Sequence, residues 1–149
     1  MPSPVSEGRD VRVGVVAAVE RDGEVLFERR TADEEDGRLW GLLAGGKTAG
    51  ESTVEAAKRE VREETGLDFH PERVVALFDH DSHYGSGTAW TVVGLAGPAD
   101  GDPDTDREPE KRDRLDWFPV DDPPAPLHPT TELFLDAHDA DGLHPGLER

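Results

Sequence analysis

Short runs of apolar residues recur along most of the chain, and each run is about the length of a β-strand. Most of the runs are rich in β-branched residues and are bounded by glycine, proline or aspartate, which is typical of strands in a buried sheet. The turn Arg21-Asp22-Gly23 predicts that the first two strands form a hairpin. The predicted strands 74–78 and 88–95 are also expected to pair with each other. The predicted strands are 11–19, 24–29, 39–43, 74–78, 88–95 and 115–120.

A helix is predicted in the middle of the chain, where the apolar spacing changes. Ser52 followed by Glu55 is the pattern of a capping box, so the helix should begin at about Thr53. Gly66 is placed to end it in a left-handed conformation. Its apolar stripe is expected at Val54, Ala57 and Val61.

A second helix is predicted near the end of the chain. Thr130 or Thr131 would cap it, and the following residues 132–140 (ELFLDAHDA) have helical spacing. Leu133, Phe134 and Ala137 are expected to face the core. The predicted order of elements is therefore strands, helix, strands, helix.

Three acids crowd the second half of the first predicted helix. Glu60, Glu63 and Glu64 are related as i, i+3 and i+4, so their carboxylates share one side of the last turns. Like charges repel, and acids are unfavourable near a helix C-terminus. The cluster is either a solvated acidic face or a site for hard divalent cations, which prefer carboxylate oxygens. Glu51 and Arg59 could pair and hold the preceding glycine-rich loop against the helix.

The spacing of residues 45–67, GGKTAGESTVEAAKREVREETGL, resembles the signature of the Nudix hydrolase family. This resemblance covers roughly residues 11–140, with its specificity concentrated in the signature. It implies the Nudix fold, an α/β/α sandwich with a mixed β-sheet. The stretch 108–118 is similar to one found in the small nucleotide-hydrolysing, MutT-like branch of the family.

The resemblance also implies roles for individual residues. Glu60, Glu63 and Glu64 would bind Mg²⁺, with Mn²⁺ as a substitute. Arg59 would orient Glu60, and Glu51 would anchor Arg59, which gives Glu63, Glu60, Arg59 and Glu51 as the catalytic set. The backbone carbonyl of Ala44, or that of Gly45, is a further expected metal ligand.

One more acid is expected to reach the cluster from outside the helix. Glu108, or failing it Glu110, lies in a predicted long acidic loop at 97–113. A carboxylate must also accept the proton of the attacking water. Glu63 and Glu108 are both candidates for that role, and the sequence leaves the choice open.

Candidate substrate-binding residues flank this region. Arg29 and Arg30 end a strand, and a guanidinium group matches phosphate oxygens, with Arg30 preferred by resemblance. Trp90 is either a base-stacking side chain or an ordinary sheet residue, and packing is the simpler interpretation. Tyr84 has a weak parallel in dinucleoside polyphosphate hydrolases. His80 and His83 suggest a second metal site only weakly, since hard cations prefer oxygen ligands.

Two positions depart from the family's usual pattern. Leu43 stands where proline is usual, so the loop is less pre-set. Thr48 stands where a glutamate is common, which removes a carboxylate that could orient the site. Neither position belongs to the signature itself.

Composition narrows the function classes. The 149-residue chain is expected to hold one domain at 11–141, between flexible ends at 1–10 and 142–149. It has no cysteine, no apolar run of membrane-spanning length and no signal-peptide pattern, so a cytoplasmic protein is expected. A net charge of −18 argues against nucleic-acid and membrane partners, and it requires a metal to accompany a phosphate ligand. Many members of the family that the chain resembles are dimers, so a homodimer is compatible with the resemblance.

The expected function is metal-dependent hydrolysis of a nucleoside diphosphate linked to another group. The preferred substrate is a nucleoside triphosphate, modified or not, cleaved to monophosphate and pyrophosphate. The alternatives within the enzyme class are a nucleoside diphosphate sugar and a dinucleoside polyphosphate. The alternative from another class is a non-catalytic nucleotide-binding sensor, although the intact acids argue against it.

Overall fold

The structure is a computed structural model that describes residues 11–31, 38–81 and 89–139. The expected flexible ends, together with His83 and Tyr84, lie outside these residues. Seven strands and two helices make up the described fold. The strands are β1 (Val11–Arg21), β2 (Glu24–Arg30), β3 (Trp40–Gly46), β4 (Asp68–Phe69), β5 (Arg73–Asp81), β6 (Ala89–Asp100) and β7 (Arg112–Phe118). The helices are α1 (Thr53–Thr65) and α2 (Pro129–Asp139).

Several element boundaries differ from the predicted ones. The short strand β4 was not predicted, because two residues are too few to show a periodicity. Strand β6 continues to Asp100 and β7 begins at Arg112, so the loop expected at 97–113 is confined to residues 101–111. The end of β6 contains the turn-type residues Gly97 and Pro98, and the start of β7 is charged, so the apolar pattern did not reveal these strand ends. Helix α2 begins at Pro129, a few residues before the expected start.

The strands form one mixed sheet. Its order is β4-β6-β1-β3-β2-β7, and β5 pairs with β6. Strands β1 and β6 run parallel over most of their length, and the other pairings are antiparallel. The predicted pairings of β1 with β2 and of β5 with β6 are both present.

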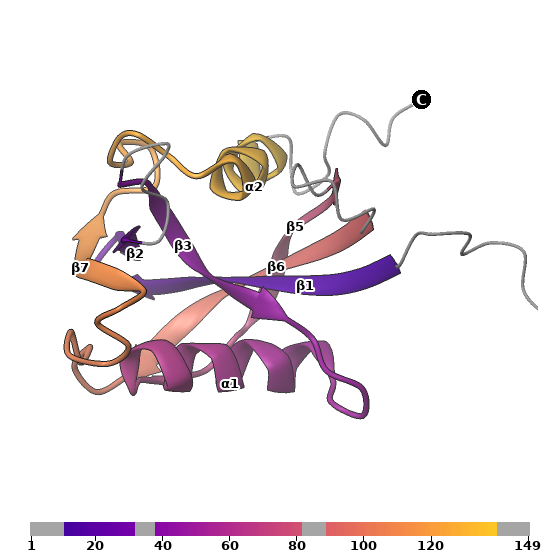
Figure 1. Ribbon diagram of the computed structural model, residues 1–149, viewed down its shortest axis with the longest axis horizontal. Helices are drawn as coiled ribbons and strands as arrows, with labels where there is room; N and C mark the ends of the chain where they lie inside the picture. Colours follow the sequence, from indigo (N-terminus) through magenta and orange to yellow (C-terminus); the bar gives the residue numbers. More distant parts are fainter. Residues whose placement is uncertain (1–10, 32–37, 82–88, 140–149) are drawn as a thin grey trace, which may run out of the picture.

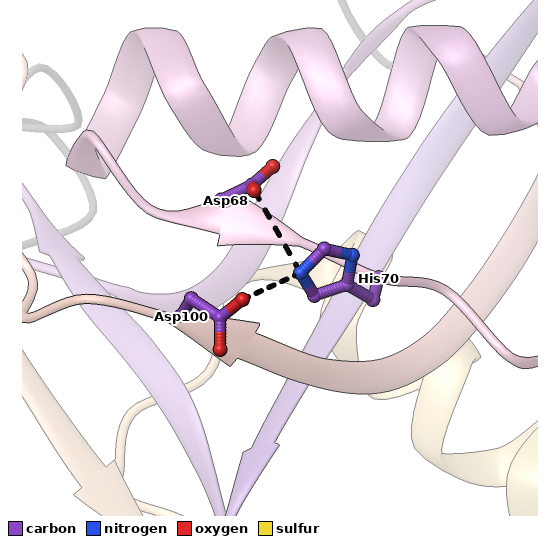
Figure 2. A group of neighbouring side chains, drawn as sticks. All are labelled: Asp68, His70 and Asp100. Atoms are coloured by element: carbon purple, nitrogen blue, oxygen red, sulfur yellow. Dashed lines mark hydrogen bonds and ion pairs between the residues drawn. The ribbon is translucent and has the colours of Figure 1, made fainter.

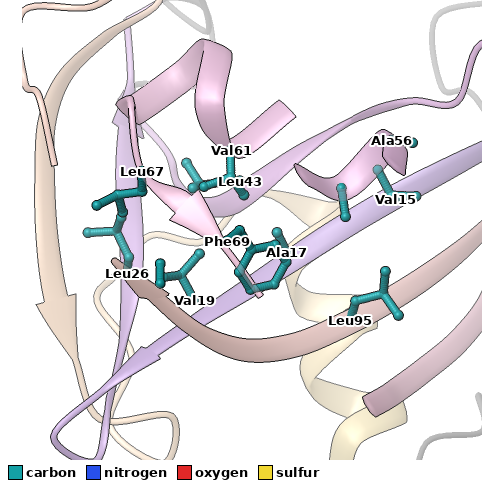
Figure 3. Packing of buried hydrophobic residues seen from close by; sticks show 12 residues of the cluster. Val15, Ala17, Val19, Leu26, Leu43, Ala56, Val61, Leu67, Phe69 and Leu95 are labelled. Carbon is teal, nitrogen blue, oxygen red and sulfur yellow. The ribbon is translucent and has the colours of Figure 1, made fainter. Parts of the chain in front are cut away.

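The two helices cover opposite faces of the sheet (Figure 1), which confirms the predicted α/β/α sandwich. Alternate residues of β1 point to the two faces, so Val15 faces α1 while Val16 faces α2. On the α1 side, Val61 of the helix packs with Leu43 and Phe69 from the sheet (Figure 3). These contacts fix α1 against the strand that precedes it.

Helix α1 has the caps that the sequence predicts. The Ser52 side chain accepts from the backbone N–H of Glu55, the Glu55 carboxylate accepts from that of Ser52, and Gly66 has φ +79°. The predicted apolar stripe was partly wrong, because Val54 is 45% exposed. The buried side of the helix instead runs through Ala57 and Val61 to Glu64, at helical spacing.

Candidate active site

Strand β3 and helix α1 meet where the signature loop ends. Gly45 lies against the Glu60 carboxylate, since a Cβ atom at Gly45 would lie 2.1 Å from the Glu60 carboxyl carbon. A glycine is therefore needed for the strand to approach the acid this closely. The neighbouring Ala44 pairs with Val16 across β1 and β3. Its predicted role as a carbonyl ligand stays a prediction.

Arg59 ties the loop to the helix acids. Its Nη2 and Nε atoms donate to the two Glu51 carboxylate oxygens at 2.7 and 3.0 Å. Nη2 also donates to the Gly46 carbonyl at 2.9 Å, and Nη1 donates to Glu60 at 2.8 Å and to Glu63 at 3.1 Å. The expected Glu51–Arg59 pair is thus present. Its hydrogen bonds and charge lower the pKa of Glu51 to about 2.

The three helix acids differ in exposure. The Glu63 side chain is 55% exposed, whereas those of Glu60 and Glu64 are 15% and 12% exposed. Burial raises the pKa of Glu60, and Arg59 partly opposes that change. Burial also raises the pKa of Glu64, and the nearby Glu28 carboxylate adds to the effect. The buried acids therefore lie where an unbalanced negative charge is unfavourable.

Glu108 faces the helix acids across an open pocket of about 470 Å³. The pocket is lined by Glu60, Glu63, Glu64, Arg107, Glu108 and Lys111. The Glu108 backbone is in the left-handed region at φ 49°, and its carboxylate lies 2.8 Å from the Lys111 ammonium group. Glu110, the second choice for this position, does not line the pocket. The structure thus brings the preferred loop acid to the helix cluster.

The side chains around this pocket fit a divalent cation. The Glu64 Oε2 atom is buried and has no hydrogen-bond partner among the described residues. An unpartnered carboxylate oxygen in such a position is costly, and a hard cation would satisfy it. The other acids offer oxygen atoms from Glu60, Glu63 and Glu108. The donor set therefore suits a hard divalent cation.

Arg29 and Arg30 face different surroundings at the end of β2. Arg29 makes a two-point contact with Asp113, at 2.8 and 2.9 Å, and its guanidinium group lies 5.8 Å from the centre of the Trp40 ring. Arg30 is the cross-strand neighbour of Arg112, so the two residues share one face of the sheet. Arg112 reaches Glu64 on that face. The predicted role of Arg30 in binding phosphate stays a prediction.

Trp90 lies on the other side of the sheet. Its ring is within van der Waals reach of a Cβ atom at Gly46, and it packs with residues of the α2-side core. The Arg12 guanidinium group lies 5.1 Å from the centre of its ring. These contacts are those of a sheet-packing residue, and a role in binding a base stays a prediction. His80 pairs with Trp90 across β5 and β6, and His83 and Tyr84 lie outside the described residues.

Three residues near the pocket were not identified from the sequence. Lys111 neutralises Glu108, while Arg112 and Glu28 form a buried ion pair beneath the acids. Glu28 follows Leu26 at strand spacing, so an acid on the core-facing side of β2 was the available signal. The pairing itself joins residues that are far apart in the chain.

A further group of ionisable side chains lies outside this pocket (Figure 2). His70 Nε2 is 2.9 Å from an Asp100 carboxylate oxygen and 3.7 Å from one of Asp68. All three side chains are exposed, and hydrogen bonding and charge pairing at the surface account for the arrangement.

No helix in the described ranges is both long enough and apolar enough to cross a membrane.

The fold and the pocket of acids define the class. The NUDIX domain family profile matches residues 8–137, so the chain belongs to the Nudix family. Nudix hydrolases generally need divalent metal ions. Among solved structures, the MutT NUDIX hydrolase from Burkholderia pseudomallei is 32% identical, with a TM-score of 0.74 over 85% of this chain and 97% of that chain. The Escherichia coli ORF135 protein is 27% identical, with a TM-score of 0.72 over 89% and 91%.

Curated relatives give a range of activities. The chain is 31% identical over 136 residues to human 8-oxo-dGDP phosphatase NUDT18, which covers 90% of this chain and 40% of that protein. It is 39% identical over 54 residues to the Escherichia coli CTP pyrophosphohydrolase, which covers 36% of this chain and 40% of that protein. The chain thus spans about 40% of the length of these relatives.

Proposed function

We propose that this protein hydrolyses a nucleoside triphosphate, modified or not, to the monophosphate and pyrophosphate with the help of Mg²⁺ or Mn²⁺. The observation that supports the proposal best is the buried, unpartnered Oε2 atom of Glu64 beside three further carboxylates in an open pocket. Without a bound cation, this cluster of partly buried carboxylates would be energetically unfavourable. The resemblance of residues 108–118 to small nucleotide-hydrolysing relatives supports the substrate class.

The chain's own residues take distinct roles in this proposal. Glu60, Glu64 and Glu108 hold the cation, and the backbone carbonyl of Ala44 or Gly45 adds a ligand. Arg59 fixes Glu60 from one side, and Glu51 fixes Arg59. When bound, the divalent cation neutralises charge on the phosphate oxygens and lowers the pKa of water.

Glu63 is the preferred proton acceptor in this proposal. It is the most exposed of the helix acids, and its carboxylate is held by Arg59 at 3.1 Å. Glu108 is less suited because this proposal already assigns it to the cation, and its carboxylate also lies 2.8 Å from the Lys111 ammonium group. The water oxygen bonds to phosphorus as the bridging P–O bond breaks, and Glu63 takes the water proton. Arg30 contacts the phosphate oxygens as an arginine fork.

A nucleoside diphosphate is the second candidate substrate. The relative matched over 90% of this chain is named an 8-oxo-dGDP phosphatase, and its identity to the chain is 31%. Hydrolysis of a diphosphate would release orthophosphate instead of pyrophosphate. Nucleoside diphosphate sugars and dinucleoside polyphosphates remain further alternatives, and a nucleotide sensor without turnover is the alternative from another class.

A substrate panel with separated products tests the proposal. Purified protein and Mg²⁺ are incubated in separate reactions with nucleoside triphosphates, 8-oxo-dGDP, an ADP-sugar and a dinucleoside polyphosphate. We expect monophosphate and pyrophosphate from a triphosphate, and no product after chelation with EDTA. Glu63→Gln should lower the turnover by roughly 10²-fold or more, as loss of a general base does. Binding of nucleotide without turnover of any panel member would reject the enzymatic proposal.

A further inference from the structure

A buried arginine lies directly behind the acids of the pocket. Arg112 is the first residue of β7 and is 2% exposed, and it is the largest of the fully buried side chains described. Its Nε atom donates to Glu28 Oε1 at 2.5 Å, and Glu28 itself is 4% exposed. The two residues therefore form an ion pair inside the protein.

The other nitrogen atoms of Arg112 contact backbone on both sides of the pocket. Nη1 donates to the Glu64 carbonyl at 3.2 Å and to the Arg107 carbonyl at 2.9 Å. Nη2 lies 3.6 Å from the Glu64 carboxylate. The first carbonyl belongs to the last turn of α1, where carbonyls lack helical donors. The second belongs to the loop that presents Glu108. One guanidinium group thus joins the two walls of the pocket.

Two further hydrogen bonds hold the same loop to the helix end. Arg107 Nη1 donates to the Arg62 carbonyl at 3.1 Å, and the backbone N–H of Asp104 donates to the Thr65 carbonyl at 2.8 Å. These two contacts are made to the carbonyls of Arg62 and Thr65. Arg112 instead contacts Glu64 itself and the carbonyl of the residue that precedes Glu108.

Stability alone does not account for this ion pair. Removing two charges from water is costly, and apolar residues of the same volume usually serve a core equally well. An arginine instead offers several donors in one rigid plane, so it can hold a carboxylate and two carbonyls at fixed positions. A lysine carries the same charge but lacks that geometry. The ion pair is better explained by the groups that Arg112 holds in position, which are the Glu64 carboxylate and the carbonyls of Glu64 and Arg107.

We propose that Arg112, with Glu28 as its counter-ion, is a positioning residue that sets the separation of Glu108 from Glu64 for binding a divalent cation. Glu28 also balances the arginine charge, so Arg112 adds little net repulsion toward the cation. The inference rests on the proposed function in one respect, because it takes these acids to be cation ligands.

The test measures Mn²⁺ binding in the absence of substrate. Free Mn²⁺ is followed by electron paramagnetic resonance during titration of wild-type protein and Arg112→Lys, which keeps the charge. We expect the dissociation constant to rise by about 10- to 100-fold, as is usual when a residue that supports metal ligands is lost. Turnover should recover in part at saturating Mn²⁺. Thermal unfolding in EDTA verifies that the variant is folded at the titration temperature.

A matched control is the exposed arginine–glutamate pair between β5 and β1. Arg73 contacts Glu20 at 2.7 and 3.0 Å, and Arg73→Lys should leave Mn²⁺ affinity at the wild-type value. If Arg112→Lys does not fold, the double variant Glu28→Gln/Arg112→Met removes both charges at similar volume. It is expected to show the same loss of affinity. Wild-type affinity in a folded Arg112 variant would overturn the positioning role.

Failure of the positioning role and failure of the proposed function give different results. A protein whose Mn²⁺ affinity depends on Arg112 but that hydrolyses no nucleotide would refute the function and support the positioning role. A protein that hydrolyses nucleotide, with unchanged Mn²⁺ affinity in Arg112→Lys, would refute the positioning role alone. Wild-type protein that binds no Mn²⁺ would refute both.

Discussion

Glu64 combines two properties that rarely occur together in one side chain. It lies on the core-facing side of α1 after Ala57 and Val61, yet it carries a carboxylate whose Oε2 atom has no hydrogen-bond partner among the described residues. A buried polar group without a partner costs about 1–3 kcal/mol. The buried Glu64 side chain therefore lowers the stability of the fold, but it provides a candidate metal ligand.

Neutralising Glu64 should separate stability from activity. Glu64→Gln keeps the shape of the side chain and replaces a carboxyl group whose negative charge is disfavoured by burial and by the nearby Glu28. We expect its melting temperature in EDTA to equal or exceed that of the wild type, while turnover with Mg²⁺ falls by roughly 10²-fold or more. Differential scanning calorimetry and steady-state kinetics measure the two effects. A variant with wild-type turnover would remove Glu64 from the proposed site.

Gly45 gives a second prediction at the scale of a single residue. A Cβ atom there would overlap the end of the Glu60 side chain, whereas one at Gly46 would lie 3.6 Å from the Trp90 ring, an ordinary contact. Gly45→Ala should displace the Glu60 carboxylate and lower turnover by about 10-fold or more, since a displacement of about 1 Å at a reacting centre can cost up to about 10²-fold in rate. Gly46→Ala is the matched control. Equal kinetics in the two variants would contradict this account.

At the scale of elements, the signature loop and α1 form one unit. The capping box fixes the start of the helix, and Arg59 then joins Glu51 and the Gly46 carbonyl to the helix acids. This unit is nearly complete within residues 45–66. Its contacts join residues that are close together in the sequence, which explains why the sequence predicted them well.

The Glu51–Arg59 pair should make a pH-dependent contribution to stability. The pKa of Glu51 falls from the model-compound value of 4.5 to about 2 in the fold, chiefly because Arg59 donates to it. The contribution is therefore present in full above about pH 4.5 and is lost as the pH falls toward 2. Melting temperatures of wild type and Glu51→Gln, measured in a chelator, should differ at pH 7 and converge near pH 2. A difference that widens at low pH would contradict the assignment.

The loop at 101–111 illustrates the opposite case. It reaches the helix only through long-range contacts, including those of Asp104, Arg107 and Arg112 with carbonyls of the last turn of α1. Its sequence predicted an acidic loop and nominated Glu108, but not the residues that hold it in place.

For the whole molecule, charge is the dominant feature. The chain carries a net charge of −18, and the proposed substrate is also an anion. Long-range repulsion slows the approach of an anion, and dissolved salt screens it over about 10 Å at 0.1 M. The pocket offers local compensation through Arg107 and Lys111.

Salt should therefore favour substrate capture over a moderate range. At saturating Mg²⁺, kcat/KM for a nucleoside triphosphate is expected to rise by roughly two-fold or more between about 0.02 and 0.2 M KCl, because repulsion is screened. The turnover number at saturating substrate should change little. A fall in kcat/KM over this range would indicate that local positive groups, and not the net charge, govern the approach.

The sequence by itself determined the helix α1, its caps and the cluster of acids, because these depend on residues within a few turns of one another. The resemblance to the Nudix signature also gave the sandwich architecture. Only the tertiary structure decided that Glu64 is buried and Val54 is not, and that Arg29 pairs with Asp113. It also brought Arg112 to Glu28 and to Glu64, which lie 84 and 48 residues away. Periodicity reports which face of an element is apolar, whereas these contacts depend on how distant strands are placed beside one another.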